Sequence, residues 1–296
     1  MPVQSHPSSW SLPAPQKIAF EEPVTAVAVR LVGGAVNVVG TDSAPAGLEL
    51  TLIDGPPLTA TLDGGVLTVT YDDLPWSWES LKKMGLPKGL RAKDWHRRAE
   101  LTLTVPKAAG VDVSVVSAST VVSHVGGATR LRGVSGDSTL LGLTGEVNAD
   151  TVSGRLEAQA LAGDLRFKSV GGGLTLVEST GGAVHADSVS GDFVIGLAPT
   201  ASAPDLDLTT VSGEIAIRLP RPADAEVDAG TTSGALSCTF DELRVSNQFM
   251  AKRVTGRLGA GRGRLKATTV SGSVALLRGP GPDETPDAPV ALGKVL

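Results

Sequence analysis

A short unit that recurs every nine residues between positions 109 and 190 constrains this chain more than any other feature. Each unit opens on Gly or Ala and closes on an apolar residue. Because a self-similar period is the signature of repeat architectures, it must be interpreted before any local propensity. The openings fall at Ala109, Ala118, Gly127, Gly136, Gly145, Gly154, Gly163 and Gly172, and then, after one extra residue, at Gly182 and Gly191.

Each unit has the pattern of one short strand followed by one corner. The third and fifth places are mostly apolar, and a spacing of two is typical of a strand with one buried face. The eighth place is apolar again, and the small residues after it allow the backbone to turn at positive φ. The pairs at the third and fifth places include Val111 and Val113, Val147 and Ala149, Leu156 and Ala158, Leu165 and Phe167, Leu174 and Leu176, and Phe193 and Ile195.

The corners alternate in kind, so two units make one coil of about eighteen residues. Val152-Ser153-Gly154 is typical of one corner and Leu161-Ala162-Gly163 of the other. Later openings fall at Gly213, Gly234, Gly256 and Gly272, with the added length in Pro-rich inserts, which a solenoid accommodates at its corners. The sequence therefore predicts an all-β fold, a flattened parallel β-solenoid with about two short strands per coil and a β-rich N-terminal region.

The segments outside the repeat set the expected domain boundaries. Between residues 26 and 71, alternating apolar runs joined by Gly and Pro turns indicate strands, which form either the first coils or a small β cap on the same sheet. Residues 1–16 are polar and Pro-rich, and we expect a flexible N-terminus there. Residues 17–278 should form a single domain, and 279–296, rich in Pro and acid, a disordered tail.

The periodicity breaks at residues 75–98, where basic and Trp residues gather. Trp78, Leu81 and Met84 are three apart, which predicts one face of a short helix. Two interpretations stay open: a cap over an exposed end of the core, or an apolar interface with a basic rim. The candidate binding residues of this insertion are Trp76, Trp78, Lys82, Lys83, Lys88, Arg91, Trp95, Arg97 and Arg98.

Composition and spacing argue against several classes of function. A net charge of −5 does not favour a nucleic-acid binder, and the single Cys238 excludes an internal disulfide. The four histidines lack metal-ligand spacing, and Arg155 interrupts the corner carboxylates that a calcium site would need. We therefore predict no cofactor, no metal and no catalytic residue. The start of the chain shows neither a signal peptide nor a spanning helix, so a cytoplasmic location is expected.

The corners also carry a family resemblance. Val-Ser-Gly-Asp at 134–137 and 189–192, its variants at 211–214 and 270–272, and the strand at 101–106 resemble the bacterial putative-adhesin family of β-strand-repeat domains of unknown function. The resemblance covers roughly residues 24–278. Its name implies surface adhesion, but it supplies no catalytic motif.

From these features we predict a non-enzymatic scaffold or interaction module with an unknown protein or surface partner and a capacity for self-association. One alternative is a carbohydrate-active β-helix enzyme, which would use outward polar residues such as Arg166, Lys168 and His185. Another is a peripheral binder of negatively charged membrane surfaces through residues 76–98, with weak, salt-sensitive affinity.

Overall fold

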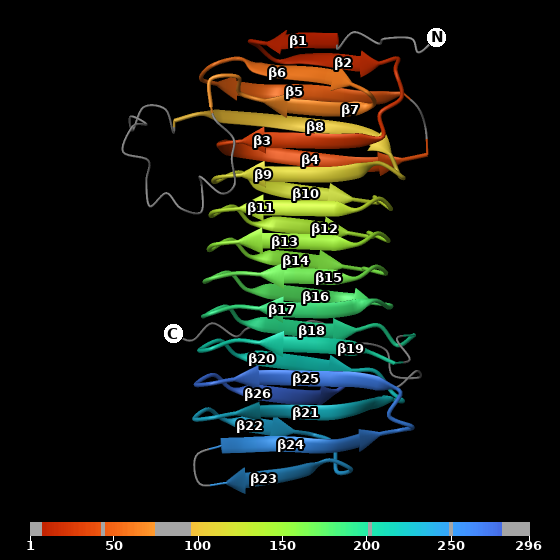
Figure 1. Cartoon of the computed structure of the whole chain (residues 1–296), viewed down its shortest axis with the longest axis vertical. Coiled ribbons are helices and arrows are strands. Elements are labelled where there is room, and N and C mark those ends of the chain that lie inside the picture. The colour runs from red at the N-terminus through yellow and green to blue at the C-terminus, as the bar shows by residue number, and fades with distance from the viewer. Residues whose placement is uncertain (1–7, 43–44, 75–95, 201–202, 249–250, 280–296) are drawn as a thin grey trace, which may run out of the picture.

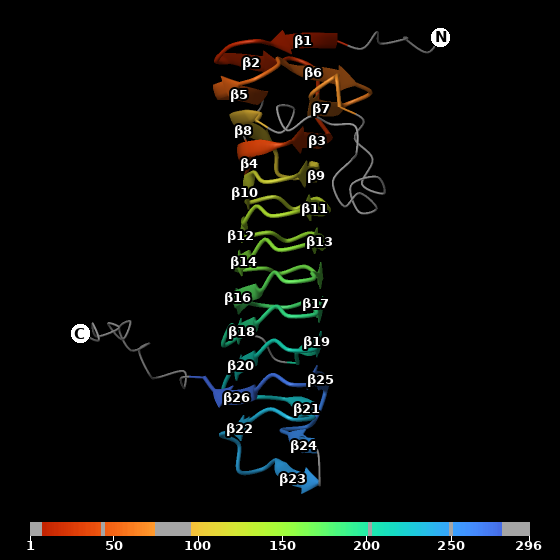
Figure 2. The same ribbon diagram turned by 90° about the vertical axis from the view of Figure 1, so that its left-hand side faces the viewer.

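The computed structural model describes residues 8–42, 45–74, 96–200, 203–248 and 251–279. These residues form strands, turns and bends, without helix, and their strands make two long sheets that face each other across one core. Figure 1 shows the strands stacked along a single long axis, and Figure 2 shows the two sheets side by side with the chain crossing between them at every level. The predicted all-β, flattened solenoid is confirmed.

Sheet A contains fourteen of the strands that the described residues form. In spatial order they are β1 (Ser8–Leu12), β6 (Leu58–Asp63), β7 (Val66–Thr70), β3 (Ala26–Leu31), β9 (Gly110–Val115), β11 (Thr129–Gly133), β13 (Val147–Thr151), β15 (Leu165–Lys168), β17 (Ala183–Asp187), β19 (Asp205–Thr209), β25 (Gly263–Thr269), β21 (Ala225–Thr231), β24 (Ala251–Leu258) and β23 (Arg244–Gln248).

Sheet B contains the other twelve strands of the described residues. In spatial order they are β2 (Gln16–Phe20), β5 (Ala46–Asp54), β8 (Arg98–Pro106), β4 (Gly33–Thr41), β10 (Ser119–Ser123), β12 (Ser138–Leu141), β14 (Leu156–Gln159), β16 (Leu174–Ser179), β18 (Phe193–Leu197), β20 (Ile215–Leu219), β26 (Val274–Arg278) and β22 (Leu236–Cys238).

The middle of the column is a regular parallel stack in which each coil adds one strand to each sheet. Val147 pairs with Leu165, and Leu156 pairs with Leu174, so neighbouring coils are offset by eighteen residues, as predicted. The third and fifth places of the units point inward and are buried, and the rings of Phe167 and Phe193 meet edge to face across the core, 6.3 Å apart. Alternation of apolar and polar residues along each strand therefore fixes which side chains face solvent.

The two corners of each coil differ in what they bury. After the strands of sheet B, the eighth-place Val125, Leu143 and Leu161 are buried. After the strands of sheet A, Val170 and Val189 are about half exposed, at 54% and 50%. At this second corner a Ser or Thr hydroxyl accepts the amide hydrogen of the Gly three residues later. The pairs are Thr151 with Gly154, Ser169 with Gly172, Ser188 with Gly191, Thr210 with Gly213, Thr269 with Gly272 and Thr231 with Gly234.

The coils do not follow the chain order at either end. Near the N-terminal end, β3 lies between β7 and β9 in sheet A, and β4 lies between β8 and β10 in sheet B. Near the C-terminal end, β25 lies between β19 and β21, and β26 lies between β20 and β22. The spacing predicted a corner at Gly256, and this prediction is wrong. Gly256 lies in the antiparallel strand β24 opposite Val227, and a Cβ there would lie only 2.9 Å from a Leu243 methyl, so the packed end of the core leaves no room for a side chain.

Antiparallel strands close the N-terminal end. β1 pairs with β6 and β2 with β5, while β3 and β4 are parallel coil strands, so the N-terminal region contains both a cap and a first coil. The prediction of a flexible start is wrong for residues 8–12 and 16. In β1, Leu12 is fully buried and Trp10 packs edge to face on Phe20, because alternation within a polar run still supplies one apolar face.

The C-terminal end of the core is covered by the turn between β22 and β23. Phe240 and Leu243 are buried there, and the Arg278 guanidinium lies 5.0 Å from the centre of the Phe240 ring. The insertion at 75–95 departs after β7 and returns before β8, which are each the third strand from the N-terminal end of their sheets. Within the described residues, antiparallel strands cover one end of the core and the turn between β22 and β23 covers the other, and the interpretation of 76–98 as a cap falls mostly on residues outside them.

Candidate interaction surfaces

The described residues include only two members of the predicted basic and Trp cluster. Trp76, Trp78, Lys82, Lys83, Lys88, Arg91 and Trp95 lie outside them, as does the predicted short helix. Arg98 is exposed and pairs with Glu100. Arg97 is only 6% exposed, so its proposed role at a binding surface is wrong. Strand alternation at the start of β8 turns Arg97 inward, a direction that composition alone did not reveal.

Arg97 instead holds together the two segments that flank residues 75–95. Its guanidinium donates two hydrogen bonds of 2.6 Å to the Asp73 carboxylate and lies 5.2 Å from the centre of the Tyr71 ring. These hydrogen bonds lower the pKa of Asp73, whereas burial raises the pKa of Tyr71 to about 12 against the opposing charge of Arg97. The cluster fixes the end of β7 against the start of β8.

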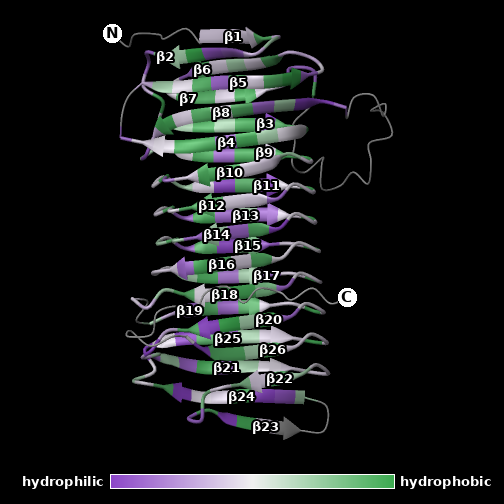
Figure 3. Cartoon of the chain, turned by 180° about the vertical axis from the view of Figure 1, so that it is seen from behind, coloured by the Kyte–Doolittle hydropathy of each residue, from purple (hydrophilic) through white to green (hydrophobic). Residues whose placement is uncertain are grey.

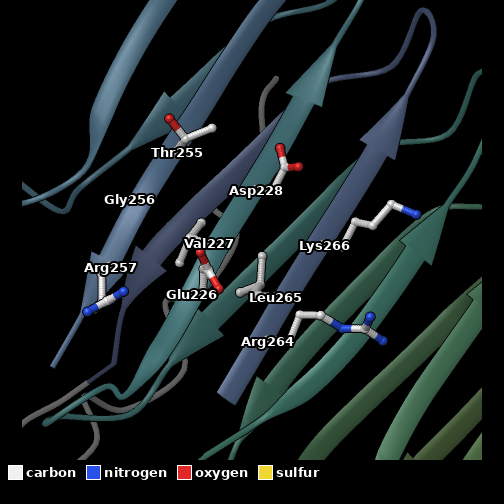
Figure 4. Close-up of a pocket in the computed structure, with 9 residues that line it drawn as sticks. All are labelled: Glu226, Val227, Asp228, Thr255, Gly256, Arg257, Arg264, Leu265 and Lys266. Carbon is white, nitrogen blue, oxygen red and sulfur yellow. The ribbon is translucent and has the colours of Figure 1, made fainter. Parts of the chain in front are cut away.

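A polar hollow of about 710 Å³ lies on the outer surface of β21, β24 and β25 (Figure 4). Of its cations, Arg264 lies 3.3 Å from Asp205 and Lys266 lies 3.5 Å from Asp207. Its carboxylate Asp228 accepts two hydrogen bonds of 2.6 and 2.5 Å from Arg253 beside the hollow. The hydrogen bonds from Arg253 hold the pKa of Asp228 below its usual range. Asp228, Arg264 and Lys266 at the hollow therefore each have a partner of opposite charge.

The outer surface of sheet A, from β9 to β21, is a charged face. Register places its outward side chains in two rows along the stack, and most are ionised at neutral pH. One row contains Asp112, Arg130, Asn148, Arg166, His185, Asp207, Lys266 and Asp228, and the other contains Ser114, Arg132, Asp150, Lys168, Asp187, Thr209, Thr268 and Gly230.

The outer surface of sheet B, from β4 to β26, is an uncharged face except at three positions, one of which is Glu178 at the bulge of β16, whose carboxylate accepts a hydrogen bond of 3.0 Å from Gln159. Within its two outward rows only Glu157 and Arg218 are ionised. One row contains Asn37, Val121, Thr139, Glu157, Thr175, Val194, Ala216 and Ala275, and the other contains Val39, Ser123, Leu141, Gln159, Val177, Gly196, Arg218 and Leu277. Figure 3 shows the hydropathy along the column.

The corner carboxylates that suggested a calcium ladder hold the backbone of neighbouring coils. Oδ1 of Asp137 accepts the amide hydrogen of Arg155 in the next coil. In the same way, Asp164 accepts the amide hydrogen of Ala183, and Asp192 that of Glu214. Among the described residues no group of three or more His, Cys, Asp or Glu side chains could hold a metal ion. In the same part of the chain, no helix has the length and apolar character needed to cross a membrane.

Comparison with known proteins identifies the family of this column. A model of the Toastrack DUF4097 family matches residues 58–277. The chain belongs to that family. This match confirms the resemblance, noted from the corner motifs, to a family of β-strand-repeat domains of unknown function. A comparison with curated proteins finds no match.

Solved structures similar to this Toastrack chain have low sequence identity. A putative adhesin from Parabacteroides distasonis is 14% identical, with 92% of this chain and 97% of that chain covered and a TM-score of 0.43. A putative adhesin from Bacteroides fragilis is 13% identical over 90% and 99%, with a TM-score of 0.42. A putative lipid binding protein from Parabacteroides distasonis is 13% identical over 89% and 96%, with a TM-score of 0.39.

The contrast between the two faces of the Toastrack column was missed by reading units one at a time. Its signal is present in the sequence: the polar places of the unit at Gly163 hold Arg166 and Lys168, whereas those of the unit at Gly172 hold Thr175 and Val177. Sorting the outward places by alternate units separates the charged face from the uncharged face. Each face is a continuous surface because coils stack in register.

Proposed function

We propose that this Toastrack chain is a non-catalytic interaction module whose charged face binds an extended anionic partner with the chemistry of an acidic polysaccharide. The observation that carries this proposal is the state of Arg166 and Lys168 on β15. Both are exposed, both point outward from one strand, and neither makes an ion pair within the described residues. In register, Arg166 lies between Asn148 and His185, and Lys168 between Asp150 and Asp187. Because neither cation forms an ion pair with these neighbours, both are more available to a polyanion than cations that already have partners.

The neighbouring coils extend this cationic site along the stack. Arg130 and Arg132 on β11 lie two strands away, a distance of about 10 Å at the usual strand spacing. Asp112 is shared between them at 3.9 and 3.6 Å, so it only partly neutralises the two guanidinium groups. A linear polyanion that follows the stack axis would therefore meet cations on β11 and on β15, with Asp150 of β13 between them.

The ionisation of the carboxyl groups favours binding over hydrolysis. Glycoside hydrolysis needs a carboxyl with a raised pKa to act as general acid. Hydrogen bonds from an Arg hold the pKa values of Asp73, Asp224 and Asp228 below their usual range. Such carboxylates stay ionised and engaged at neutral pH, which suits a structural ion pair.

The test is binding of fluorescently labelled polygalacturonate, with the length of the polymer measured in the same sample. The wild type should bind at low salt and leave the polymer intact. The double variant Arg166→Ser/Lys168→Ser should bind about tenfold more weakly, taking somewhat under 1 kcal/mol for each exposed cation. The matched control is Arg264→Ser/Lys266→Ser, which removes the same charge from the same face but from cations paired with Asp205 and Asp207.

Equal losses in the two variants would mean that net charge alone decides binding and would overturn the proposed site. Polymer shortening by the purified protein would support the enzyme instead. If the protein does not bind polygalacturonate at low salt but sediments with phosphatidylserine vesicles, its partner is a membrane surface and not a polysaccharide.

A further inference from the structure

Besides Glu178, which is held by Gln159 at the bulge of β16, the uncharged face carries in its outward rows two opposite charges that form no ion pair within the described residues of one copy of the chain. Glu157 lies on β14 and Arg218 on β20, three strands away, so they are separated by about 14 Å along the stack. Both are exposed, and neither makes an ion pair within the described residues. A partner surface can complement such a pair by placing an opposite charge against each of the two side chains.

We propose that this face is the interface of a two-fold symmetric dimer of the chain, with the two columns antiparallel. A two-fold axis that runs along the strand direction, midway between β16 and β18, exchanges β14 with β20. It therefore brings Glu157 of each copy to Arg218 of the other, and a two-fold interface makes that contact twice. The two side chains belong to adjacent rows, an offset of about 7 Å that a Glu and an Arg together can span.

The same axis matches the shapes of the two surfaces at their centre. It exchanges β16 with β18, so Val177 of one copy lies opposite Gly196 of the other. Val177 is 41% exposed, and Gly196 has no side chain, so one copy supplies a projection where the other supplies space. Val194, which is 48% exposed, lies opposite Thr175. At the ends of the overlap, β12 is exchanged with β26, so Leu141 meets Leu277.

The size of the overlap predicts a weak dimer. Six strands, β12 to β26, overlap, each with about five residues in the contact, which gives a footprint of about 500 Å² per copy. The total of about 1,000 Å² is at the lower limit for a specific interface, so a dissociation constant of roughly micromolar order is expected. The charged face does not offer such an interface, because its ions would have to be desolvated.

The test is sedimentation velocity of the full chain across a concentration series from about 1 to 200 µM, the range where such a dimer should dissociate. The wild type should show a concentration-dependent dimer. Glu157→Arg alone and Arg218→Glu alone should each weaken dimerisation at least tenfold, because each places like charges opposite one another. The double variant Glu157→Arg/Arg218→Glu should restore it, because the pair is exchanged rather than removed.

Two further variants separate this interface from other causes. Gly196→Val should abolish the dimer while folding normally, since a Cβ there lies 3.7 Å from the nearest atom, the Leu176 carbonyl oxygen. Arg166→Ser/Lys168→Ser on the opposite face should dimerise as the wild type does, so failure of the polysaccharide site and failure of the dimer are distinguishable. A wild type that stays monomeric throughout, a dimer that Glu157→Arg leaves intact, or a double variant that stays monomeric would each overturn the proposal.

Discussion

Replacement of Gly172 by Ala tests the corner stacking on which the solenoid depends. Gly172 joins β15 to β16 and lies on Gly154 of the preceding coil. A Cβ at Gly172 would lie 2.1 Å from the Gly154 carbonyl oxygen and 2.8 Å from the Ser169 hydroxyl. Since real Cβ atoms essentially never approach below 3.0 Å, the two coils must separate at this corner.

That separation should be costly because neighbouring hydrogen bonds hold the corner. The Gly172 amide donates to Ser169 Oγ at 2.6 Å, and the Gly171 amide donates to the Val152 carbonyl at 2.7 Å. Overpacking of a tight site typically costs 1–3 kcal/mol, and a weakened hydrogen bond adds about 1. We therefore expect Gly172→Ala to lower the free energy of unfolding by about 3 kcal/mol.

The adjacent residue provides a matched control. A Cβ at Gly171 would have its nearest neighbours, Ser190 Oγ and the Val152 carbonyl oxygen, at 3.7 Å, which is ordinary contact. Gly171→Ala should be neutral or stabilising by up to about 0.5 kcal/mol, through the entropy of the unfolded chain. Urea unfolding followed by far-ultraviolet circular dichroism measures both variants. A Gly172→Ala protein within 0.5 kcal/mol of the wild type, or equal losses in the two variants, would refute the stacking argument.

Three other predictions concern strain, burial and acid. Ala160 has a φ of 54°, so Ala160→Gly should stabilise the protein by about 0.5 kcal/mol, because relief of the left-handed strain exceeds the entropy that Gly adds to the unfolded chain. The control Ala158→Gly, at a buried inward position, should destabilise the protein in the same urea assay. Arg97→Met should destabilise by about 2 kcal/mol in that assay, a value reduced because Asp73 is half exposed, and an unchanged midpoint would contradict the anchoring role. Because Asp73, Asp224 and Asp228 have lowered pKa values, their contribution to stability is present above the unfolded Asp pKa of about 3.9 and is lost as pH falls through the folded values. The melting temperature should therefore be level from pH 7 to 5 and fall below pH 4, and it should fall less steeply in Asp224→Asn. A melting temperature independent of pH would contradict this.

Much of the column could be predicted because each unit specifies its own strand and corner. Alternation at Leu165 and Phe167 predicts an inward pair, and the structure buries both. The hydroxyls of Thr210, Thr231 and Thr269 accept the amide hydrogens of corner glycines only three residues further along the chain. These features depend on sequence separations of a few residues.

The features that the sequence did not predict depend on contacts between distant segments. Nothing local to Gly263–Thr269 shows that β25 enters between β19 and β21, because any parallel strand of similar pattern could pair there. The spacing that made Gly256 a corner fails because the chain has already turned into an antiparallel strand. Arg97 was grouped with neighbouring cations by composition, whereas its partner Asp73 lies beyond the whole insertion.

Stacking in register gives each face of the column a fixed pattern of side chains that a partner recognises. The most direct measurement is sedimentation velocity of an equimolar mixture of the Glu157→Arg and Arg218→Glu proteins. Each protein alone should dimerise at least tenfold more weakly than the wild type, because like charges meet across its own two-fold axis. The mixture should form a heterodimer with wild-type affinity, because every contact then joins opposite charges. A mixture that stays monomeric, or variants that dimerise alone as the wild type does, would contradict the claim.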